Sequence, residues 1–174
     1  MSSQWRSAGR SRSSSSAIEI RRLEPDEWQS FREVRLAALR EAPYAFGSTF
    51  EAEIGSDEET WRARLVDRTR FVAESDGKVL GTVGGGESNH PGTAALTSLW
   101  VDPQARGRGV GEGLVRAVLD WAQRSGFEEV VLWVVEGNSS AERLYERAGF
   151  KSTGAVATVR PGDDRVEHEM SRAL

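Results

Sequence analysis

The sequence contains no cysteine and only two histidines. Without thiols the chain forms no disulfide, no zinc–thiolate site and no cysteine nucleophile. His90 and His168 are far apart in the sequence and lack the spacing of metal ligands. No apolar run approaches the roughly 20 residues that a membrane-spanning helix needs. We therefore expect neither a metal site nor a membrane partner.

Basic residues are also too few to give the chain a positive field. The 23 Lys and Arg residues face 27 Asp and Glu residues, a net charge of -4. A chain with this balance does not attract nucleic acid or an anionic membrane through its overall charge. We expect no nucleic-acid partner, and any arginine patch must be local.

Residues 1–17 are rich in Ser and Arg and nearly free of apolar side chains. This composition predicts a disordered tail. The tail lacks the apolar segment of a secretory signal, so a cytoplasmic protein is the default expectation. The remaining residues, 18–174, are enough for one domain with a sizeable core.

Strand and helix signals alternate through residues 18–174. Asp76-Gly77 between two alternating runs predicts a hairpin, and Gly84–Gly86 ends or bulges its second strand. Residues 44–54 read as an irregular segment, and Ser139–Glu142 reads as a capping box that opens a helix. The predicted order is strand, two helices, three strands, helix, strand, helix and two strands. It indicates an α/β sandwich with a mixed six- to seven-stranded sheet and helices on both faces.

The stretch Asp102–Gly111 lies between a predicted strand and a predicted helix, with glycines at 107, 109 and 111. Glycine lets the backbone approach a ligand closely because it has no Cβ. The helix that follows presents unpaired N–H groups and the positive end of its dipole. Arg106 and Arg108 add donors that pair with phosphate. The stretch is typical of a phosphate cradle.

Two familiar phosphate loops do not fit this stretch. The mononucleotide loop needs Gly-x4-Gly-Lys-Ser/Thr, which the sequence does not contain. The dinucleotide fingerprint needs a third glycine where this chain has Glu112, and it belongs after the first strand, not the fourth.

The string Gln104–Gly109 matches a third pattern, Gln/Arg-x-x-Gly-x-Gly/Ala. A second segment matches Asn-x-x-Ala-x-x-Leu-Tyr-x-x-x-Gly-Phe through Asn138, Ala141, Leu144, Tyr145, Gly149 and Phe150. With these two motifs the chain resembles the GNAT superfamily of acyl-CoA-dependent N-acetyltransferases. The resemblance covers Ile18–Leu174.

The resemblance implies acetyl-CoA as co-substrate and no metal. Backbone amides of the glycine turn would hold the coenzyme A pyrophosphate, and the acyl arm would lie where the strand before the turn splays from Val130–Val135. Tyr145 would protonate the departing thiolate, and Asn138 would bind the pantetheine and cap the last helix. The implied coenzyme-binding residues are Leu99, Trp100, Val101, Gln104, Arg106, Gly107, Arg108, Gly109, Val110, Gly111, Asn138 and Tyr145.

The acceptor end departs from the family pattern. An alkylamine has a pKa near ~10.4 and must lose a proton before it attacks, a step for which a positioned base supplies roughly 10²–10⁴-fold. Many relatives carry a glutamate on the strand where this chain has Thr97 and Ser98. We predict instead that Glu51 binds the acceptor ammonium and relays its proton through water, with Phe46 and Phe50 as substrate-binding walls. Glu53 is a second candidate for the base.

These features predict an enzyme that moves an acetyl group from acetyl-CoA to a primary amine of a small molecule by direct attack. Two alternatives stay open: acetylation of a protein N-terminus or lysine, and a non-catalytic acyl-CoA sensor. The sequence does not identify the acceptor, the acyl-chain preference or the oligomeric state, although homodimers are common in the family.

Overall fold

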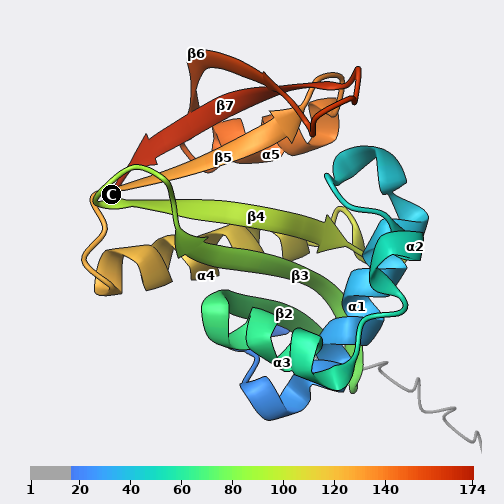
Figure 1. Cartoon of the computed structure of the whole chain (residues 1–174). Helices are drawn as coiled ribbons and strands as arrows, with labels where there is room; N and C mark the ends of the chain where they lie inside the picture. Colours follow the sequence, from blue (N-terminus) through green and yellow to red (C-terminus); the bar gives the residue numbers. More distant parts are fainter. Residues whose placement is uncertain (1–16) are drawn as a thin grey trace, which may run out of the picture.

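The computed structural model describes residues 17–174, so the tail predicted over residues 1–17 lies outside them except for Ala17 (Figure 1). In chain order the elements are β1 (Glu19–Arg22), η1 (Pro25–Glu27), α1 (Trp28–Glu41), η2 (Pro43–Ala45), α2 (Phe50–Glu53), α3 (Glu58–Asp67), β2 (Thr69–Ser75), β3 (Lys78–Glu87), β4 (Thr93–Val101), η3 (Pro103–Ala105), α4 (Val110–Arg124), β5 (Glu129–Val135), α5 (Ser139–Arg147), β6 (Lys151–Thr158) and β7 (Val166–Ala173).

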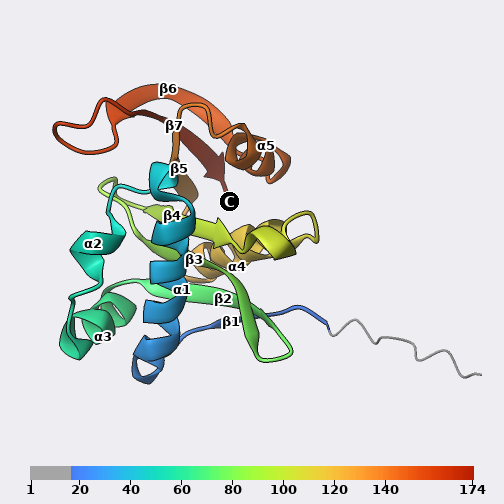
Figure 2. The same ribbon diagram turned by 90° about the vertical axis from the view of Figure 1, so that its right-hand side faces the viewer.

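Within residues 17–174, seven strands form one sheet in the order β1-β2-β3-β4-β5-β7-β6. Neighbouring strands are antiparallel except β4 and β5, which are parallel. Helices α1, α2 and α3 cover one face of the sheet, and α4 and α5 lie on the other (Figure 2). The predicted α/β sandwich with a mixed sheet is confirmed.

Each face of the sheet has its own apolar core. On the α4 side, Leu114 and Val118 follow the helical repeat and pack with Val130 of β5. On the α1 side, Phe31 and Trp61 meet edge to face, with ring centroids 5.5 Å apart. Burial of each such side chain is worth about 1.5–3 kcal/mol. The two cores fix the sheet between its helices and so fix the strand ends that carry the site.

Strand β4 changes its pairing halfway along its length. Its parallel pairing with β5 covers only Thr93–Ala95, after which the two strands diverge (Figure 1). On its other edge, Ser98 and Leu99 lie opposite the single residue Val83 of β3, and Ser98 has a φ of 53°. This is a β-bulge, which bends a strand and increases its twist. The bulge and the divergence lie at the same level of the sheet.

Two local predictions are wrong in part. The glycines Gly84–Gly86 do not end their strand, because β3 continues to Glu87; the register shift between Thr82 and Gly84 is the predicted bulge. The segment 44–54 is not irregular throughout, because Phe50–Glu53 form the single turn of α2. Thr49 Oγ1 accepts a hydrogen bond from the Ala52 N–H and caps that turn.

The last helix begins where the sequence predicts, and its cap is Asn138, as the resemblance implies, instead of the capping box. Asn138 Oδ1 accepts from the Ala141 N–H at 3.3 Å, so Asn138 is the N-cap and the predicted capping box at Ser139–Glu142 is wrong. Asn and Ser are about equally good N-caps, and the chain direction after β5 brings the Asn side chain onto the helix end.

Candidate active site

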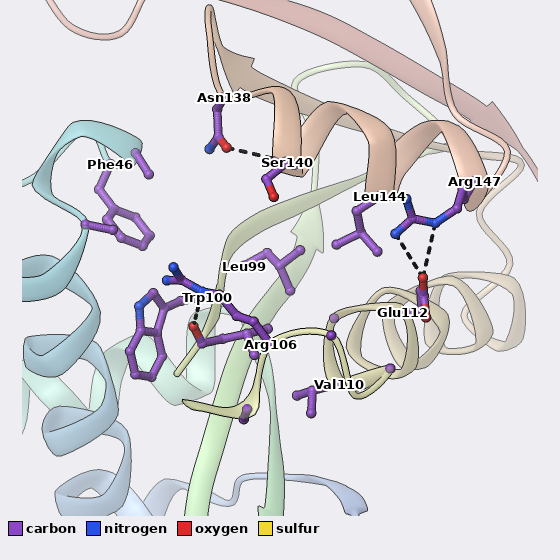
Figure 3. A pocket seen from close by; sticks show the side chains of 18 of the residues that line it. Phe46, Leu99, Trp100, Arg106, Val110, Glu112, Asn138, Ser140, Leu144 and Arg147 are labelled. Atoms are coloured by element: carbon purple, nitrogen blue, oxygen red, sulfur yellow. Dashed lines mark hydrogen bonds and ion pairs between the residues drawn. The ribbon is translucent and has the colours of Figure 1, made fainter. Parts of the chain in front are cut away.

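Two adjoining cavities lie where β4 and β5 diverge. The larger, of about 320 Å³, is bounded by the end of β4, the turn before α4 and the first half of α5 (Figure 3). The smaller, of about 80 Å³, lies between the bulge of β4 and the end of β5. Phe46, Leu99 and Asn138 belong to the walls of both. The two cavities therefore form the two ends of one cleft.

The glycine turn forms one wall of the larger cavity. Gly107 and Gly109 have φ values of 73° and 79°, in the left-handed region that favours glycine. The first hydrogen bond of α4 runs from the Gly113 N–H to the Gly109 carbonyl. The N–H groups of Val110 and Gly111 therefore have no partner inside the helix, and both residues line the cavity. This is the arrangement that binds an anion at a helix N-terminus.

The first turn of α4, directly after the first motif, contacts the second motif through Gly111. A Cβ on Gly111 would lie 3.0 Å from Leu144 Cδ2, tighter than ordinary contact. The missing side chain lets α5 approach α4, and Leu144 points into the larger cavity (Figure 3). Asn138, at the start of α5, completes this side of the cleft.

The Arg106 side chain is bound within the cleft wall. Its Nη2 lies 2.7 Å from Glu41 Oε2, and its Nε donates to the Val101 carbonyl at 3.1 Å. The same Glu41 oxygen accepts from Trp100 Nε1 at 2.9 Å. Glu41 thus ties the end of α1 to β4 and to the glycine turn. It belongs to no motif, and the sequence gives no sign of its role.

Four other polar residues of this region have unexpected places. Arg147 Nη2 lies 3.0 Å from Glu112 Oε1 at the edge of the larger cavity, a pair that the sequence reading missed (Figure 3). Gln104 and Arg108 are exposed and stand outside the walls of both cavities.

Tyr145 lies at the other end of the cleft. Its side chain is buried, lines the smaller cavity and packs against the Phe150 ring with centroids 5.9 Å apart. Burial raises the pKa of the Tyr145 hydroxyl well above its usual value, because it disfavours the charged phenolate. Tyr145 therefore carries its proton at neutral pH.

The structure brings together only part of the predicted acceptor site. Phe46 lines both cavities. Phe50 is half-buried under the Arg40 guanidinium, 4.3 Å from its ring centroid, and is outside the cavity walls. Glu51 is exposed on α2 and also outside those walls. Among the described residues that line the smaller cavity there is no Asp, Glu or His.

Glu53 has a different environment from Glu51, two residues away. It is buried, with Oε1 2.8 Å from Arg35 Nη2 and Oε2 2.9 Å from Arg64 Nη1. Burial by itself would raise the pKa of the Glu53 carboxyl. Hydrogen bonds from Arg35 and Ser48 and the charges of Arg35 and Arg64 outweigh it and hold the pKa at about 2. Such a carboxyl is a poor proton acceptor, so Glu53 serves as an ionic link.

Thr97 and Ser98, the residues at the place of the family's strand glutamate, line the smaller cavity. Ser98 Oγ accepts a hydrogen bond from Arg35 Nη1 at 3.2 Å. Within residues 17–174, no group of His, Asp and Glu side chains could hold a metal, and no helix is long and apolar enough to cross a membrane.

Comparison with known proteins finds one family. The model of the acetyltransferase (GNAT) family matches residues 22–150, which include the glycine turn and Asn138–Phe150. Human N-acetyltransferase 8B is 43% identical over 88 residues, which are 48% of this chain and 39% of that protein. N-acetylaspartate synthetase of Xenopus tropicalis is 32% identical over 101 residues, 58% of this chain and 37% of that protein. The matches thus span about four tenths of the length of these curated relatives.

Solved structures share the fold. A Salmonella typhimurium protein solved with its cofactor acetyl-CoA superposes with a TM-score of 0.72 and 24% identity, covering 91% of this chain and 95% of that one. At this identity the likeness concerns the fold alone.

Proposed function

Because the chain belongs to the GNAT family of acetyltransferases, we propose that it transfers an acetyl group from acetyl-CoA to a primary amine of a small molecule. The observation that carries the proposal is the cleft itself. A helix N-terminus suited to an anion stands at one end, and a protonated, buried tyrosine stands at the other. The acetyl-CoA in the Salmonella neighbour and the small-molecule product named for N-acetylaspartate synthetase support the same assignment.

The residues of the larger cavity fit coenzyme A. The glycine turn offers backbone N–H groups to a pyrophosphate without interference from a Cβ. Beyond Ala95 the edge of β4 that faces β5 has no paired strand within the described residues, so Leu99–Val101 can offer backbone groups to an extended pantetheine. Arg106 orders the end of β4 through the Val101 carbonyl, and Asn138 faces the arm from α5. Bound acetyl-CoA supplies the activated acetyl group as a thioester.

Two proton transfers would involve the chain's own groups: one to the departing sulfur and one from the acceptor ammonium. As the amine nitrogen bonds to the acetyl carbon and the carbon–sulfur bond breaks, negative charge develops on sulfur, and the Tyr145 hydroxyl donates to it. A thiol has a pKa near ~8.5, and burial holds the pKa of the Tyr145 hydroxyl well above the ordinary ~10 of tyrosine, so the phenol stabilises the thiolate mainly by its hydrogen bond. The ammonium proton leaves through water toward Glu51. Glu53 is unsuited to that step, because two arginines hold its pKa at about 2.

Release of free thiol from acetyl-CoA tests the proposal. The purified chain is assayed with polyamines, aminoglycosides, amino acids and short peptides. Turnover with a small amine supports it. Turnover confined to peptides would favour a protein acetyltransferase. Tight binding of acetyl-CoA with no turnover on any acceptor would identify a sensor and refute the proposal.

A further inference from the structure

Arg70 of β2 is a charged side chain without a matching charge. It is 8% exposed, and its Nε and Nη1 atoms have no hydrogen-bond partner among residues 17–174. Its guanidinium lies over the Phe31 ring, 5.0 Å from the centroid. Arginine is almost never fully buried unless it is paired, and an unpaired donor there costs free energy. A residue of this kind needs an explanation beyond packing.

The strand register aligns Arg70 with Thr97, which lines the smaller cavity, although Arg70 itself is in the walls of neither cavity. Arg70 pairs with Gly84 of β3, and Gly84 pairs with Thr97 of β4, so the three residues form a row across three strands. A Cβ on Gly84 would collide with Arg70 Nη1 and would lie 2.8 Å from Thr97 Oγ1. The absence of a side chain at Gly84 is what lets the guanidinium lie across β3 toward Thr97.

Thr97 connects this row to the smaller cavity. Its Oγ1 is also buried and has no hydrogen-bond partner within residues 17–174. The residue itself stands in the wall of the cavity that Tyr145 lines. Two unsatisfied polar side chains therefore meet over Gly84, and one of them borders the predicted reaction centre. Turning the Arg70 guanidinium toward that cavity breaks no hydrogen bond at Nε or Nη1.

The surroundings of Arg70 carry surplus positive charge. Among residues 17–174, the charged groups with the largest effect on it are the guanidiniums of Arg35, Arg64 and Arg68 and the carboxylate of Glu53. Glu53 is already engaged by Arg35 and Arg64. Burial, followed by the charges of Arg35 and Arg68, lowers the pKa of Arg70 to about 9. The cluster lacks an anion.

We propose that the acceptor is an amino acid or a similar amine with a carboxylate, and that Arg70 and Thr97 bind this carboxylate. The inference rests on the proposed function and specifies its acceptor. The planar guanidinium fork matches a carboxylate, and the threonine hydroxyl adds a donor. With its carboxylate at this row, a small amino acid has its amine beside the bulge at Ser98, on the side of the cavity that Tyr145 lines.

Matched acceptors and variants test the proposal. Thiol release is measured for the common amino acids and for the carboxamide and decarboxylated counterpart of each substrate. We expect the counterparts to lose roughly 10- to 100-fold in kcat/KM, the range for hydrogen bonds to a charged group. Arg70→Met should lower kcat/KM for the amino acid by a similar factor, mainly through KM, and leave the carboxamide unchanged. Thr97→Val should lower kcat/KM for the amino acid by a smaller factor. Arg124→Met, at an exposed arginine, is the matched control and should leave kcat/KM unchanged.

Stability separates a binding role from a structural one. If Arg70 serves the ligand, Arg70→Met removes an unpaired buried charge, and the variant should melt at the same temperature as the wild type or higher. The amino acid should raise the melting temperature of the wild type, with coenzyme A present, but not that of Arg70→Met. A lower melting temperature of the variant together with an unchanged KM would overturn the proposal.

These experiments distinguish failure of the carboxylate site from failure of the proposed function. Good turnover of polyamines or other amines without a carboxylate, unaffected by Arg70→Met, would refute the carboxylate site and keep the proposed function. If no acceptor turns over, the proposed function fails, and the melting experiment decides the site alone. If amino acids raise the melting temperature of the wild type but not that of Arg70→Met, the carboxylate site is supported. If they raise neither, the carboxylate site is refuted.

Discussion

The two ends of the cleft are built in different ways. The coenzyme end consists of backbone: left-handed glycines, a helix N-terminus and the unpaired edge of β4, within one short stretch of chain. The proposed acceptor end consists of side chains: charged groups of α1, α2, α3 and β2, and the neutral Thr97 and Ser98 of β4, held by ion pairs and by register across the sheet. On the proposed function, backbone geometry would bind the constant ligand, the coenzyme, whereas side chains can change to suit different acceptors.

The largest expected effect belongs to Tyr145, the proposed proton donor in the smaller cavity. Tyr145→Phe keeps the ring but removes the proton donor, and we expect kcat to fall by roughly 10²–10³-fold, within the range for general acids. Steady-state kinetics with acetyl-CoA binding measured by calorimetry checks this. Wild-type turnover with normal coenzyme binding would show that the departing thiolate takes its proton elsewhere.

Loss of the ionic link at the acceptor end should affect stability strongly. Glu53→Gln leaves Arg35 and Arg64 without their carboxylate, and breaking a buried pair costs about 3 kcal/mol of unfolding free energy. The folded pKa lies below the ordinary 4.5, so the stabilisation is full above pH 4.5 and is lost as the pH falls toward about 2. Urea unfolding at pH 7, 4 and 2.5 measures it.

The neighbouring exposed carboxyl provides the control for that experiment. Glu51→Gln, on the same helix turn, should leave unfolding unchanged at each pH. Equal losses in the two variants at pH 7 would mean that the Glu53 ion pairs do not hold the acceptor end together.

A smaller effect is expected from strain in the glycine turn. Gly109→Ala places a side chain at a φ of 79°, which costs about 1–2 kcal/mol. The KM for acetyl-CoA should rise about tenfold at constant KM for the amine. Gly77→Ala has the same strain (φ 73°) in the β2–β3 hairpin, where a Cβ meets nothing within 4 Å, and is the matched control. A rise in both KM values would contradict the separation of the two ends.

The smallest effect is expected at Glu51. Its carboxyl is exposed and, on the proposed function, would act through water, so Glu51→Gln should lower kcat/KM for the amine by less than the roughly 10²-fold of a directly positioned base. The pH–rate profile is the measurement. An unchanged rate and profile would eliminate Glu51 and leave solvent as the proton acceptor.

The sequence predicted the glycine turn between a strand and a helix, because the determinants of that turn are contiguous. Glycines in a strand–helix turn constrain the backbone locally, and Asp76-Gly77 sets its hairpin in the same way. The predicted fold order followed from the same local signals, although the choice of Asn138 over Ser139 as cap depended on how the chain leaves β5.

The arrangement at the proposed acceptor end could not be predicted from the sequence, because its residues are far apart in the chain. Glu53 meets Arg35 across 18 residues, and Arg70 is aligned with Thr97 only through strand register. Glu51 and Glu53 look alike in the sequence, and only packing against two arginines makes one buried and leaves the other in solvent.

The short pairing between β4 and β5 divides the sheet into a four-stranded and a three-stranded part, joined by only three residue pairs, Thr93–Ala95 with Glu129–Val131. An extended pantetheine lying in the gap would act as a partial eighth strand that bridges the two parts. Backbone amides along the open edge of β4 should then exchange hydrogen rapidly in the free protein and slowly in its complex with coenzyme A, so that the co-substrate is also a component of the fold.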